Sequence, residues 1–327
     1  MTDRPPAGPL PGAARGEDEL LARLRGALST RVPRRGEVHL GDDAAVLRPA
    51  RGKALFAVDV LIEGVHFDLL LGSLEDVGWK SLEVNVSDIA AMGGIPTHAV
   101  CGVGAPPGTP LDDLFSGLMA SADHHGLTLV GGDLSVGPAV FVSVAILGET
   151  AGTGPVLRSG ASVGDVVWCT GALGSSAAGL ARLRAGRAEA SAPVSTGDPL
   201  VRAYLRPSAR AREGRFAAEL GATAMIDVSD GLVRDAGHLA AESGVAIDLE
   251  HVPVAPGATE ELALGGGEDY ELVFSTPAGL DVEEAFAGEG LQRPIRIGRC
   301  REAPEGHSAL VTLRGAPAPL GGWVHPL

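Results

Sequence analysis

The segment that most constrains this chain spans residues 224–239 and reads AMIDVSDGLVRDAGHL. Its apolar start delivers Asp227, Ser229 and Asp230 onto the first turn of an expected helix that runs to about Ser243. Two carboxylates three residues apart repel each other, and burying them unpaired costs free energy or forces protonation. Because Mg²⁺ takes oxygen ligands and is bound by carboxylates together with phosphates, the segment predicts a divalent cation site. Plain helix capping by Ser229 or Asp230 is the alternative.

Other acidic residues interrupt apolar segments in the same manner. Asp59 stands alone in the apolar run ALFAVDVLI, where a buried charge needs a partner. His66 lies seven residues on, out of reach of Asp59 unless the chain bends at Gly64, and a surface or capping role is its alternative. The acidic residues at the ends or middles of apolar segments are Asp42, Asp43, Asp59, Asp88, Asp133, Asp227 and Asp230. Gathered at one place, they would need several divalent cations, which suits phosphate transfer.

A helix is expected over residues 74–92, because Ser73-Leu-Glu-Asp76 has the form of a capping box. Its apolar stripe, at spacings of three and four, consists of Trp79, Leu82, Val86 and Ile89. A second, small and polar face is formed by Ser81, Asn85, Asp88 and Met92. Lysine and glutamate, which coat most solvated faces, are largely missing there, so we interpret this face as turned toward a site. A solvated face is the alternative.

Glycine-rich turns mark several of the remaining boundaries. Gly131-Gly132-Asp133 ends one expected strand, and three glycines precede Glu268 and Asp269 before another; such glycines let a phosphate or metal approach the main chain. Thr109 is expected to be an N-cap, with Pro110 at the first helical position. In the second half, the pattern predicts a strand over 164–170, a helix over 177–185, a polar stretch to about 198 and a helix over 208–220.

The chain of 327 residues is long enough for two domains. Residues 1–16 are rich in proline and glycine and are expected to form a disordered tail. The boundary is expected at about residue 150, in a stretch of glycine and threonine, which gives an N-terminal domain over 17–150 and a C-terminal domain over 151–327. The fold class is α+β, with a mixed β-sheet covered by helices in each domain and the site in the cleft between them.

The net charge of −15 argues against a nucleic-acid partner, since affinity for a phosphate backbone requires a basic face. Three widely spaced cysteines fit a reducing compartment and indicate neither a disulfide framework nor a zinc site. No apolar run approaches the length of a membrane helix, and the first residues lack a signal-peptide core, so a soluble cytoplasmic protein is expected. Any polyanionic ligand must be met by metal ions or by a few placed basic groups.

The usual nucleotide-binding loops are absent from the sequence: there is no GxxxxGK[ST], no GxGxxG between a strand and a helix, and no kinase-type catalytic set. A nucleotide would therefore have to be bound through metals, glycine-rich backbone and Arg158, whose guanidinium is a natural fork for phosphate.

Taken in order, these motifs resemble the thiamine-monophosphate kinase family, part of the superfamily of aminoimidazole ribonucleotide synthetase and selenophosphate synthetase. The motifs that carry the resemblance are GDDAAVL, VDVLIEGVHF, NVSDIAAMGG, GGD, LRSG, IDVSDGL and LGGGEDYEL, and it covers residues 17–327. It implies that the γ-phosphoryl group of ATP, the co-substrate, passes directly to thiamine monophosphate, giving thiamine diphosphate. It also implies a homodimer joined through the N-terminal domains.

Carried over by position, the resemblance assigns several Mg²⁺ ions to Asp43, Val58 (main chain), Asp59, Asp88, Asp133, Asp227 and Asp230. Of these, it implies direct roles in catalysis for Asp43, Asp88, Asp133, Asp227 and Asp230. Nucleotide would contact Gly132, Asp133, Arg158 and Ser229, and thiamine phosphate would contact His66, Glu268 and Trp323. The chain departs from the family at Ala57-Val58, where hydroxyl residues are usual, so one metal loses a side-chain ligand.

The implied chemistry fits this residue set. The attacking phosphate monoester is mostly ionised near neutral pH because its second pKa is about 6, so no general base is required. Catalysis then consists of alignment and charge neutralisation. Two alternatives remain: another ATP-dependent synthetase of the same superfamily, and a non-catalytic sensor of Mg²⁺ and nucleotide. No cysteine precedes Cys101 and the chain ends in HPL, which disfavours the relatives that use a cysteine near the N-terminus or at the C-terminus.

Overall fold

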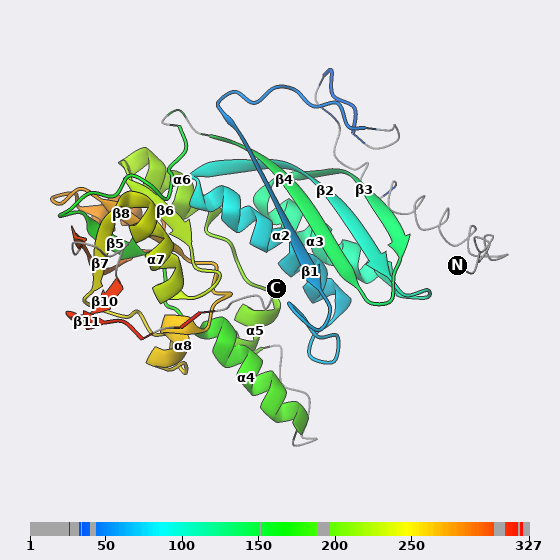
Figure 1. Cartoon of the computed structure of the whole chain (residues 1–327). Helices are drawn as coiled ribbons and strands as arrows, with labels where there is room; N and C mark the ends of the chain where they lie inside the picture. Colours follow the sequence, from blue (N-terminus) through cyan, green and yellow to red (C-terminus); the bar gives the residue numbers. More distant parts are fainter. Residues whose placement is uncertain are drawn as a thin grey trace, which may run out of the picture.

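The computed structural model of the chain describes residues 26, 33, 35–39, 44–150, 152, 154–188, 197–303, 311–319 and 321–322. Within these residues, two β-sheets with their own helices lie side by side (Figure 1). The sheets confirm an α+β fold with two sheet-based halves. The predicted tail over 1–16 lies outside the described residues, as do the candidate site residues Asp43 and Trp323.

The first sheet has the strand order β1-β4-β2-β3. Its strands are β1 (Ala54–Ile62), β2 (Gly94–Ala105), β3 (Thr128–Val136) and β4 (Phe141–Thr150). The β1–β4 and β4–β2 pairs are antiparallel and the β2–β3 pair is parallel, so the sheet is mixed. One face packs on helices α2 (Leu74–Ala91) and α3 (Leu111–His125), and alternate residues of the strands form a core with them.

The ends of these two helices test the capping predictions. The capping box at Ser73 and Asp76 is present, and α2 ends one residue before the predicted end. The predicted cap at Thr109 is wrong, because Pro110 is the N-cap of α3 and the Thr109 hydroxyl donates to the Pro106 carbonyl instead. The hydroxyl therefore stabilises the preceding turn and leaves the helix terminus without a side-chain cap.

The second sheet has the order β11-β10-β7-β9-β5-β8-β6. Its strands are β5 (Val166–Cys169), β6 (Ala224–Asp227), β7 (Val245–Leu249), β8 (Leu272–Thr276), β9 (Ile295–Glu302), β10 (Val311–Leu313) and β11 (Ala316–Pro317). Only β10 and β7 pair in parallel among these described strands. The helices of this half are α4 (Ser175–Ala188), α5 (Pro199–Leu205), α6 (Ala211–Leu220), α7 (Leu232–Ser243), α8 (Glu260–Gly265) and α9 (Val282–Gly288).

Several predicted bounds in this half were wrong. The strand predicted over 164–170 is shorter at both ends, and the helix predicted over 177–185 is longer at both ends. Helix α5 was not predicted, although Asp198 caps it and Pro199 starts it. The helix predicted from 208 begins at Ala211, because residues 207–209 face the first half: the Pro207 carbonyl accepts from Trp79, and the Ala209 amide donates to Glu83.

Helix α2 lies between the two halves and packs against both of them. Besides the first sheet and α3, it contacts β6, α5 and α6 of the second half. Ala90 and Ala91 at its end pack with Ala217, Met225 and other residues of the second half in one apolar cluster. Because α2 is fixed from both sides, the side chains along it are held between the two sheets. Among the described helices, none combines the length and hydropathy required to cross a bilayer.

The crossing of α2 and α3 gives a prediction for stability. Gly78 and Gly117 face the other helix, and a Cβ at Gly117 would collide with the Glu75 carbonyl and the Trp79 amide. Gly117→Ala is therefore expected to lower the free energy of unfolding by about 1–3 kcal/mol through overpacking. Thermal and denaturant unfolding measure the loss. Gly288→Ala in α9, where a Cβ has open space, is the control. Equal stability of the two variants would contradict this packing.

Candidate active site

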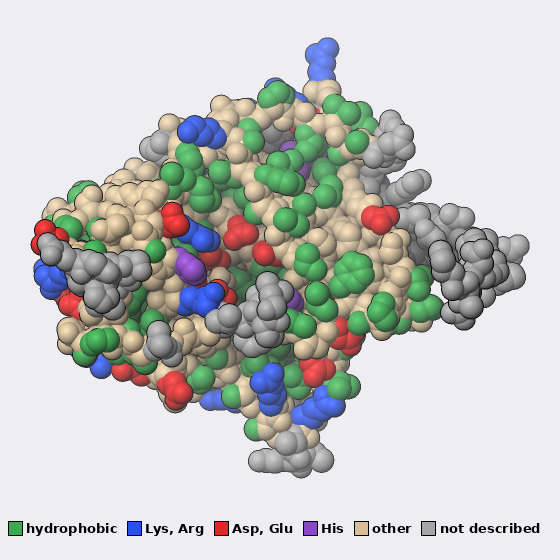
Figure 2. Space-filling view, in the orientation of Figure 1, with side chains coloured by type: hydrophobic (Ala, Val, Ile, Leu, Met, Phe, Trp, Pro, Cys, Tyr) green, Lys and Arg blue, Asp and Glu red, His purple; other side chains and the backbone are tan. Residues whose placement is uncertain are grey.

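A cavity of about 410 Å³ lies between the two halves of the molecule. Its walls come from β1, the turn after β1, α2, α4, α5, the turn after β6 and the segment before β8. In the surface view, acidic side chains lie around a hollow near the middle of the molecule (Figure 2). Segments that are far apart in sequence therefore contribute to a single site.

Four of the predicted carboxylates line this cavity together: Asp59 on β1, Asp88 on α2, Asp227 at the end of β6, and Asp230 in the turn that follows. Asp59 lies on the inner face of β1, where Leu55 and Leu61 are buried, so it points toward α2 and away from the exposed side chains of Phe56, Val58 and Val60. The sequence pattern of one Asp within an apolar strand thus delivers a carboxylate to the inside of the sheet.

The carboxylates perturb one another's protonation. Burial, followed by repulsion from Asp227 and Asp59, raises the pKa of Asp88 to about 8, against a smaller lowering by Arg158. Burial and Asp227 also raise the pKa of Asp59. Burial raises the pKa of Asp227 as well, although the Ser87 hydroxyl and Arg158 oppose it. Ionisation of these carboxylates is therefore unfavourable in the cavity. A positive charge placed among their oxygens would stabilise the ionised forms and offset both the burial and the mutual repulsion.

Helix α2 supplies the groups that orient two of these acids. The Ser87 hydroxyl donates to Asp227 Oδ2 at 2.7 Å, and both side chains are buried. The Asp59 amide donates to Asn85 Oδ1 at 3.1 Å, and the amide of the Asn85 side chain donates to the Ser81 carbonyl. The polar face predicted on this helix is thus buried against β1, with Asp88 reaching the cavity.

The turn from 228 to 231 is held by an acid that the sequence analysis did not select. Asp235 Oδ2 accepts from the amides of Ser229, Asp230 and Gly231, each at 3.0 Å. Helix α7 begins only at Leu232, its N-cap is Gly231, and no side chain caps it. The alternative in which Ser229 or Asp230 caps the helix is therefore wrong. The side chains of both residues instead line the cavity, and Asp230 accepts from Arg234 Nε at 2.9 Å.

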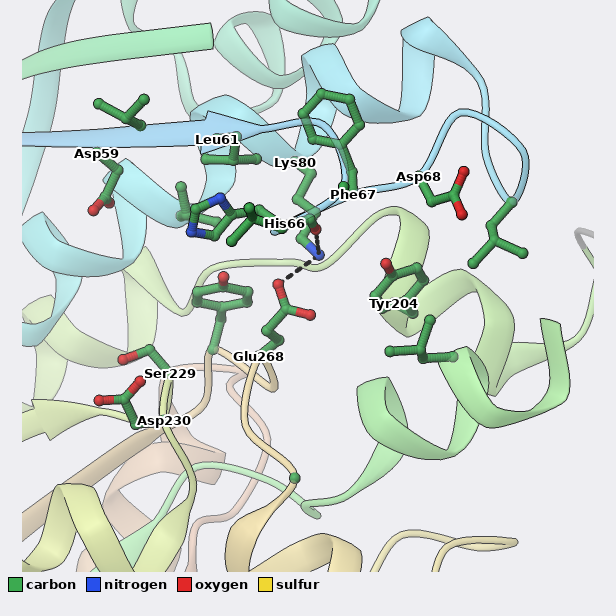
Figure 3. Close-up of a pocket in the computed structure, with 18 of the residues that line it drawn as sticks. Asp59, Leu61, His66, Phe67, Asp68, Lys80, Tyr204, Ser229, Asp230 and Glu268 are labelled. Carbon is green, nitrogen blue, oxygen red and sulfur yellow. Dashed lines mark hydrogen bonds and ion pairs between the residues drawn. The ribbon is translucent and has the colours of Figure 1, made fainter. Parts of the chain in front are cut away.

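The opposite end of the cavity carries His66, Glu268 and Tyr204, together with Lys80 (Figure 3). The chain turns at Gly64, which has a φ of +82°, and His66 Nδ1 accepts from the Ile62 amide at 3.1 Å. This bend brings His66 and Asp59 to the same cavity. The neighbour of Glu268, Asp269, faces away and accepts from the amides of Gly174 and Ser176 at the start of α4.

Some candidate residues lie apart from the cavity. Asp133 and Gly132 are exposed on β3, at the opposite edge of the first sheet from β1. Asp59 pairs with Val144, Val144 with Cys101, and Cys101 with Gly132 across the sheet. Three inter-strand spacings therefore separate Asp59 from Gly132, about 14 Å. The Val58 side chain is exposed on the outer face. Arg158 is exposed, yet its charge lowers the pKa values of Asp88 and Asp227, so it lies near the acidic end.

The structure adds residues that the sequence analysis missed, chiefly Lys80, Ser87, Tyr204 and Asp235. The sequence did contain a signal for Lys80. Lys80, Val84 and Asp88 follow one another at intervals of four residues, which places them on one face of the helix, and all three line the cavity. Tyr204 lies on α5, which was not predicted, and its contribution depends on tertiary contacts.

Comparison with known proteins places the chain in a class. The family models described as AIR synthase related protein match in both halves, with the N-terminal domain over residues 41–150 and the C-terminal domain over 162–310. E. coli HypE, a hydrogenase maturation protein, shares this fold with a TM-score of 0.73 at 20% identity, over 95% of this chain and 98% of that one. The chain is therefore an AIR synthase related protein with the two-domain fold of that class.

Closer relatives define the family within this class. The thiamine-monophosphate kinase of Mycobacterium tuberculosis is 37% identical over 79% of this chain and 80% of its own length. That of Escherichia coli K12 is 36% identical over 74% and 77%. The crystal structure of the Stenotrophomonas maltophilia enzyme has a TM-score of 0.79 at 31% identity, over 91% and 96%. This chain belongs to the thiamine-monophosphate kinase family.

The perturbed acids give a pH-dependent prediction. A carboxyl with a raised pKa in the folded state binds its proton more tightly than in the unfolded chain, so its contribution to stability is present at low pH and lost as pH rises through about 8 for Asp88. In metal-free protein at about pH 9, Asp88→Asn is therefore expected to raise the melting temperature by about 2–4 °C. The increase in melting temperature that added Mg²⁺ gives the wild-type protein is expected to grow as pH rises, because the carboxylate ligands must lose their protons to bind the ion.

Differential scanning fluorimetry across pH, with and without MgCl₂, measures both effects. Asp113→Asn, at an exposed position in the first turn of α3, is the control: it is expected to lower the melting temperature slightly, because an acid is lost from a helix N-terminus, and to leave the Mg²⁺ increment unchanged. If Asp88→Asn melted below the wild type at this pH in the absence of metal, the repulsion described for the cavity would be refuted.

Proposed function

We propose that this chain phosphorylates thiamine monophosphate to thiamine diphosphate, with direct transfer of the γ-phosphoryl group of ATP. The observation that carries the proposal is the cavity in which Asp59, Asp88, Asp227 and Asp230 meet at one end, with His66 and Glu268 at the other. Its family supports the same reaction, and the solved structure of AaThiL complexed with AMPPCP and TMP has a TM-score of 0.73 at 32% identity, over 97% of this chain and 99% of that one.

The acidic end of the cavity fits magnesium. Its donors are carboxylate oxygens, the ligands that hard cations prefer, and their raised pKa values mark a site short of positive charge. Asp59, Asp88, Asp227 and Asp230 would hold the ions, with Asp43 as a further ligand that lies outside the described residues. Bound Mg²⁺ supplies neutralisation of the phosphate charges that must approach each other.

The residues of the chain then bind and orient the two substrates. Arg158 and the Ser229 turn would contact the nucleotide, and His66, Glu268 and Trp323 would contact thiamine monophosphate. The turn at 229–231 is rigid because Asp235 accepts three of its amides, so the position of Asp230 is preset. The acceptor phosphate is already ionised at neutral pH, which agrees with a cavity rich in acids that function as ligands.

Substitution at Asp227, the most buried of the four cavity carboxylates, tests the reaction. Asp227→Asn removes a charged ligand at a position fixed by Ser87, and is expected to lower kcat for thiamine diphosphate formation by about 10²- to 10³-fold. The product is followed by chromatography after incubation with ATP, MgCl₂ and thiamine monophosphate. Asp113→Asn is the control for a lost surface charge.

Three outcomes separate the alternatives. ATP hydrolysis at the same rate with and without thiamine monophosphate would indicate another ATP-dependent member of the superfamily. Binding of ATP and Mg²⁺ without turnover would indicate a sensor. Full activity of Asp227→Asn would contradict the assignment of the acidic cluster.

We also propose that the protein is a homodimer in the cytoplasm, joined through the first sheet of the N-terminal domain, residues 17–150. The outer face of that sheet exposes large apolar side chains, with Phe56 70% and Val58 56% exposed, and Val60 and Ile62 beside them. Apolar side chains gather over this face in the surface view (Figure 2). Its edge strands β1 and β3, nine residues each, are unpaired on their outer sides within the described residues, and long apolar edges are normally covered.

A dimer of this kind accounts for Asp133. Within one chain Asp133 lies about 14 Å across the sheet from β1, too far to share an ion with Asp59. If β3 of one subunit lies beside β1 of the other, Gly132 and Asp133 in the middle of β3 approach the acidic cluster of the partner subunit. Each site would then combine residues of two subunits.

Complementation tests this arrangement. Asp59→Asn and Asp133→Asn homodimers are each expected to be nearly inactive. Random mixing after refolding is expected to restore about a quarter of wild-type activity, because half of the dimers would carry one intact site. The mixture is assayed beside each variant alone, and the subunit ratio is confirmed by mass spectrometry. No recovery, with dimers verified by light scattering, would contradict a site shared between subunits.

A further inference from the structure

We propose that Lys80 is a positioning residue that sets Glu268 for the acceptor substrate by tying three segments of the chain together. This inference rests on the proposed function, in which Glu268 contacts thiamine monophosphate. Lys80 extends from the first half of α2 to the end of the cavity away from Ser229 and Asp230 (Figure 3). Lys80 lies outside the motifs quoted above for the resemblance.

The ammonium group of Lys80 meets three different partners. Its Nζ lies 2.7 Å from Glu268 Oε1 in the segment before β8. It donates to the His66 carbonyl at 3.3 Å, in the turn after β1. It also lies 4.3 Å from the centre of the Tyr204 ring on α5, within the range of a cation–π contact. One buried group thus joins the two halves of the molecule at the substrate end of the cavity.

Because Lys80 is buried, its charge requires a partner. The Lys80 side chain is only 4% exposed, and removing one partner of a buried charge pair leaves the other charge uncompensated. The chain contains 24 arginines and only two lysines, and one of the two lysines is this buried group. A compact ammonium with three donors can serve partners in three directions, whereas a guanidinium directs its five donors within one plane.

The backbone around Glu268 explains what Lys80 adds. Glu268 has a φ of +56° and Tyr270 a φ of +52°, both in the left-handed region that costs energy for residues with a side chain. Two hydrogen bonds hold this segment: the Glu268 amide donates to the Ser229 carbonyl at 2.8 Å, and the Tyr270 amide donates to the Val228 carbonyl at 2.9 Å. The backbone of Glu268 is therefore fixed to the turn that carries Asp230, and Lys80 fixes its carboxylate.

Exposure separates the roles of the two residues. The Glu268 side chain retains 29% exposure in the cavity, while Lys80 is almost fully covered. Glu268 can thus accept a hydrogen bond from a ligand while one oxygen stays on Lys80. The pair is neutral as a unit, so Glu268 offers a hydrogen-bond acceptor at this end of the cavity without adding net charge. Lys80 consequently acts through Glu268 and His66.

Substitution of Lys80 tests the proposal by separating KM from kcat. Lys80→Met keeps most of the length of the side chain but removes the charged group, and is expected to raise KM for thiamine monophosphate by about 10- to 100-fold. KM for ATP is expected to stay within about twofold, because the nucleotide end is held by other residues. Lys80→Arg keeps the charge and is expected to give an intermediate KM. Lys53→Met, at the only other lysine and exposed, is the control.

A double-mutant cycle identifies the partner. In a Glu268→Gln background, Lys80→Met is expected to raise KM for thiamine monophosphate far less than in wild-type protein, because the carboxylate that Lys80 positions is already absent. If Lys80→Met does not fold, Lys80→Arg carries the test alone. An unchanged KM for thiamine monophosphate in the folded Lys80 variants, or full additivity with Glu268→Gln, would overturn the proposal while leaving the kinase reaction intact. A wild-type protein that forms no thiamine diphosphate would overturn both.

Discussion

The repulsion among Asp59, Asp88 and Asp227 is the constraint on which the rest of this structure depends. Their carboxylates line one cavity, and each has a raised pKa because burial and neighbouring acids oppose its charge. Such an unfavourable cluster occurs where the surrounding fold holds the acids together, and it is typical of functional sites. Here the surrounding fold is α2, clamped between two sheets and bonded to Asp227 through Ser87 and to β1 through Asn85.

In the proposed function, the two ends of the cavity have different roles in phosphoryl transfer. Its acidic end is suited to cations and nucleotide, and its other end offers His66, Glu268, Tyr204 and Lys80 to an organic acceptor. The Ser229 carbonyl connects the two ends, because it accepts from the Glu268 amide while its own turn carries Asp230. In the proposed reaction, this backbone geometry would help to align the two phosphates, because it exists before either substrate binds.

Much of this arrangement is visible in the sequence. The Asp within the apolar run of β1 and the Asp-x-Ser-Asp turn after β6 could be recognised because charges inside apolar segments need partners, and α2 was delimited by its capping box. Other features depend on tertiary contacts. Asp235 bonds a turn that lies before its own helix, α5 is short and lies beside α4, and the separation of Asp133 from Asp59 follows from strand order, which periodicity does not encode.

The most direct measurement is anomalous scattering from crystals grown with Mn²⁺, a non-hydrolysable ATP analogue and thiamine monophosphate. Our account predicts manganese peaks within bonding distance, about 2.0–2.3 Å, of carboxylate oxygens from Asp59, Asp88, Asp227 or Asp230, with phosphate oxygens of both ligands on the same ions. Manganese bound only outside this cavity, or both phosphates bound with no ion between them and these acids, would contradict it.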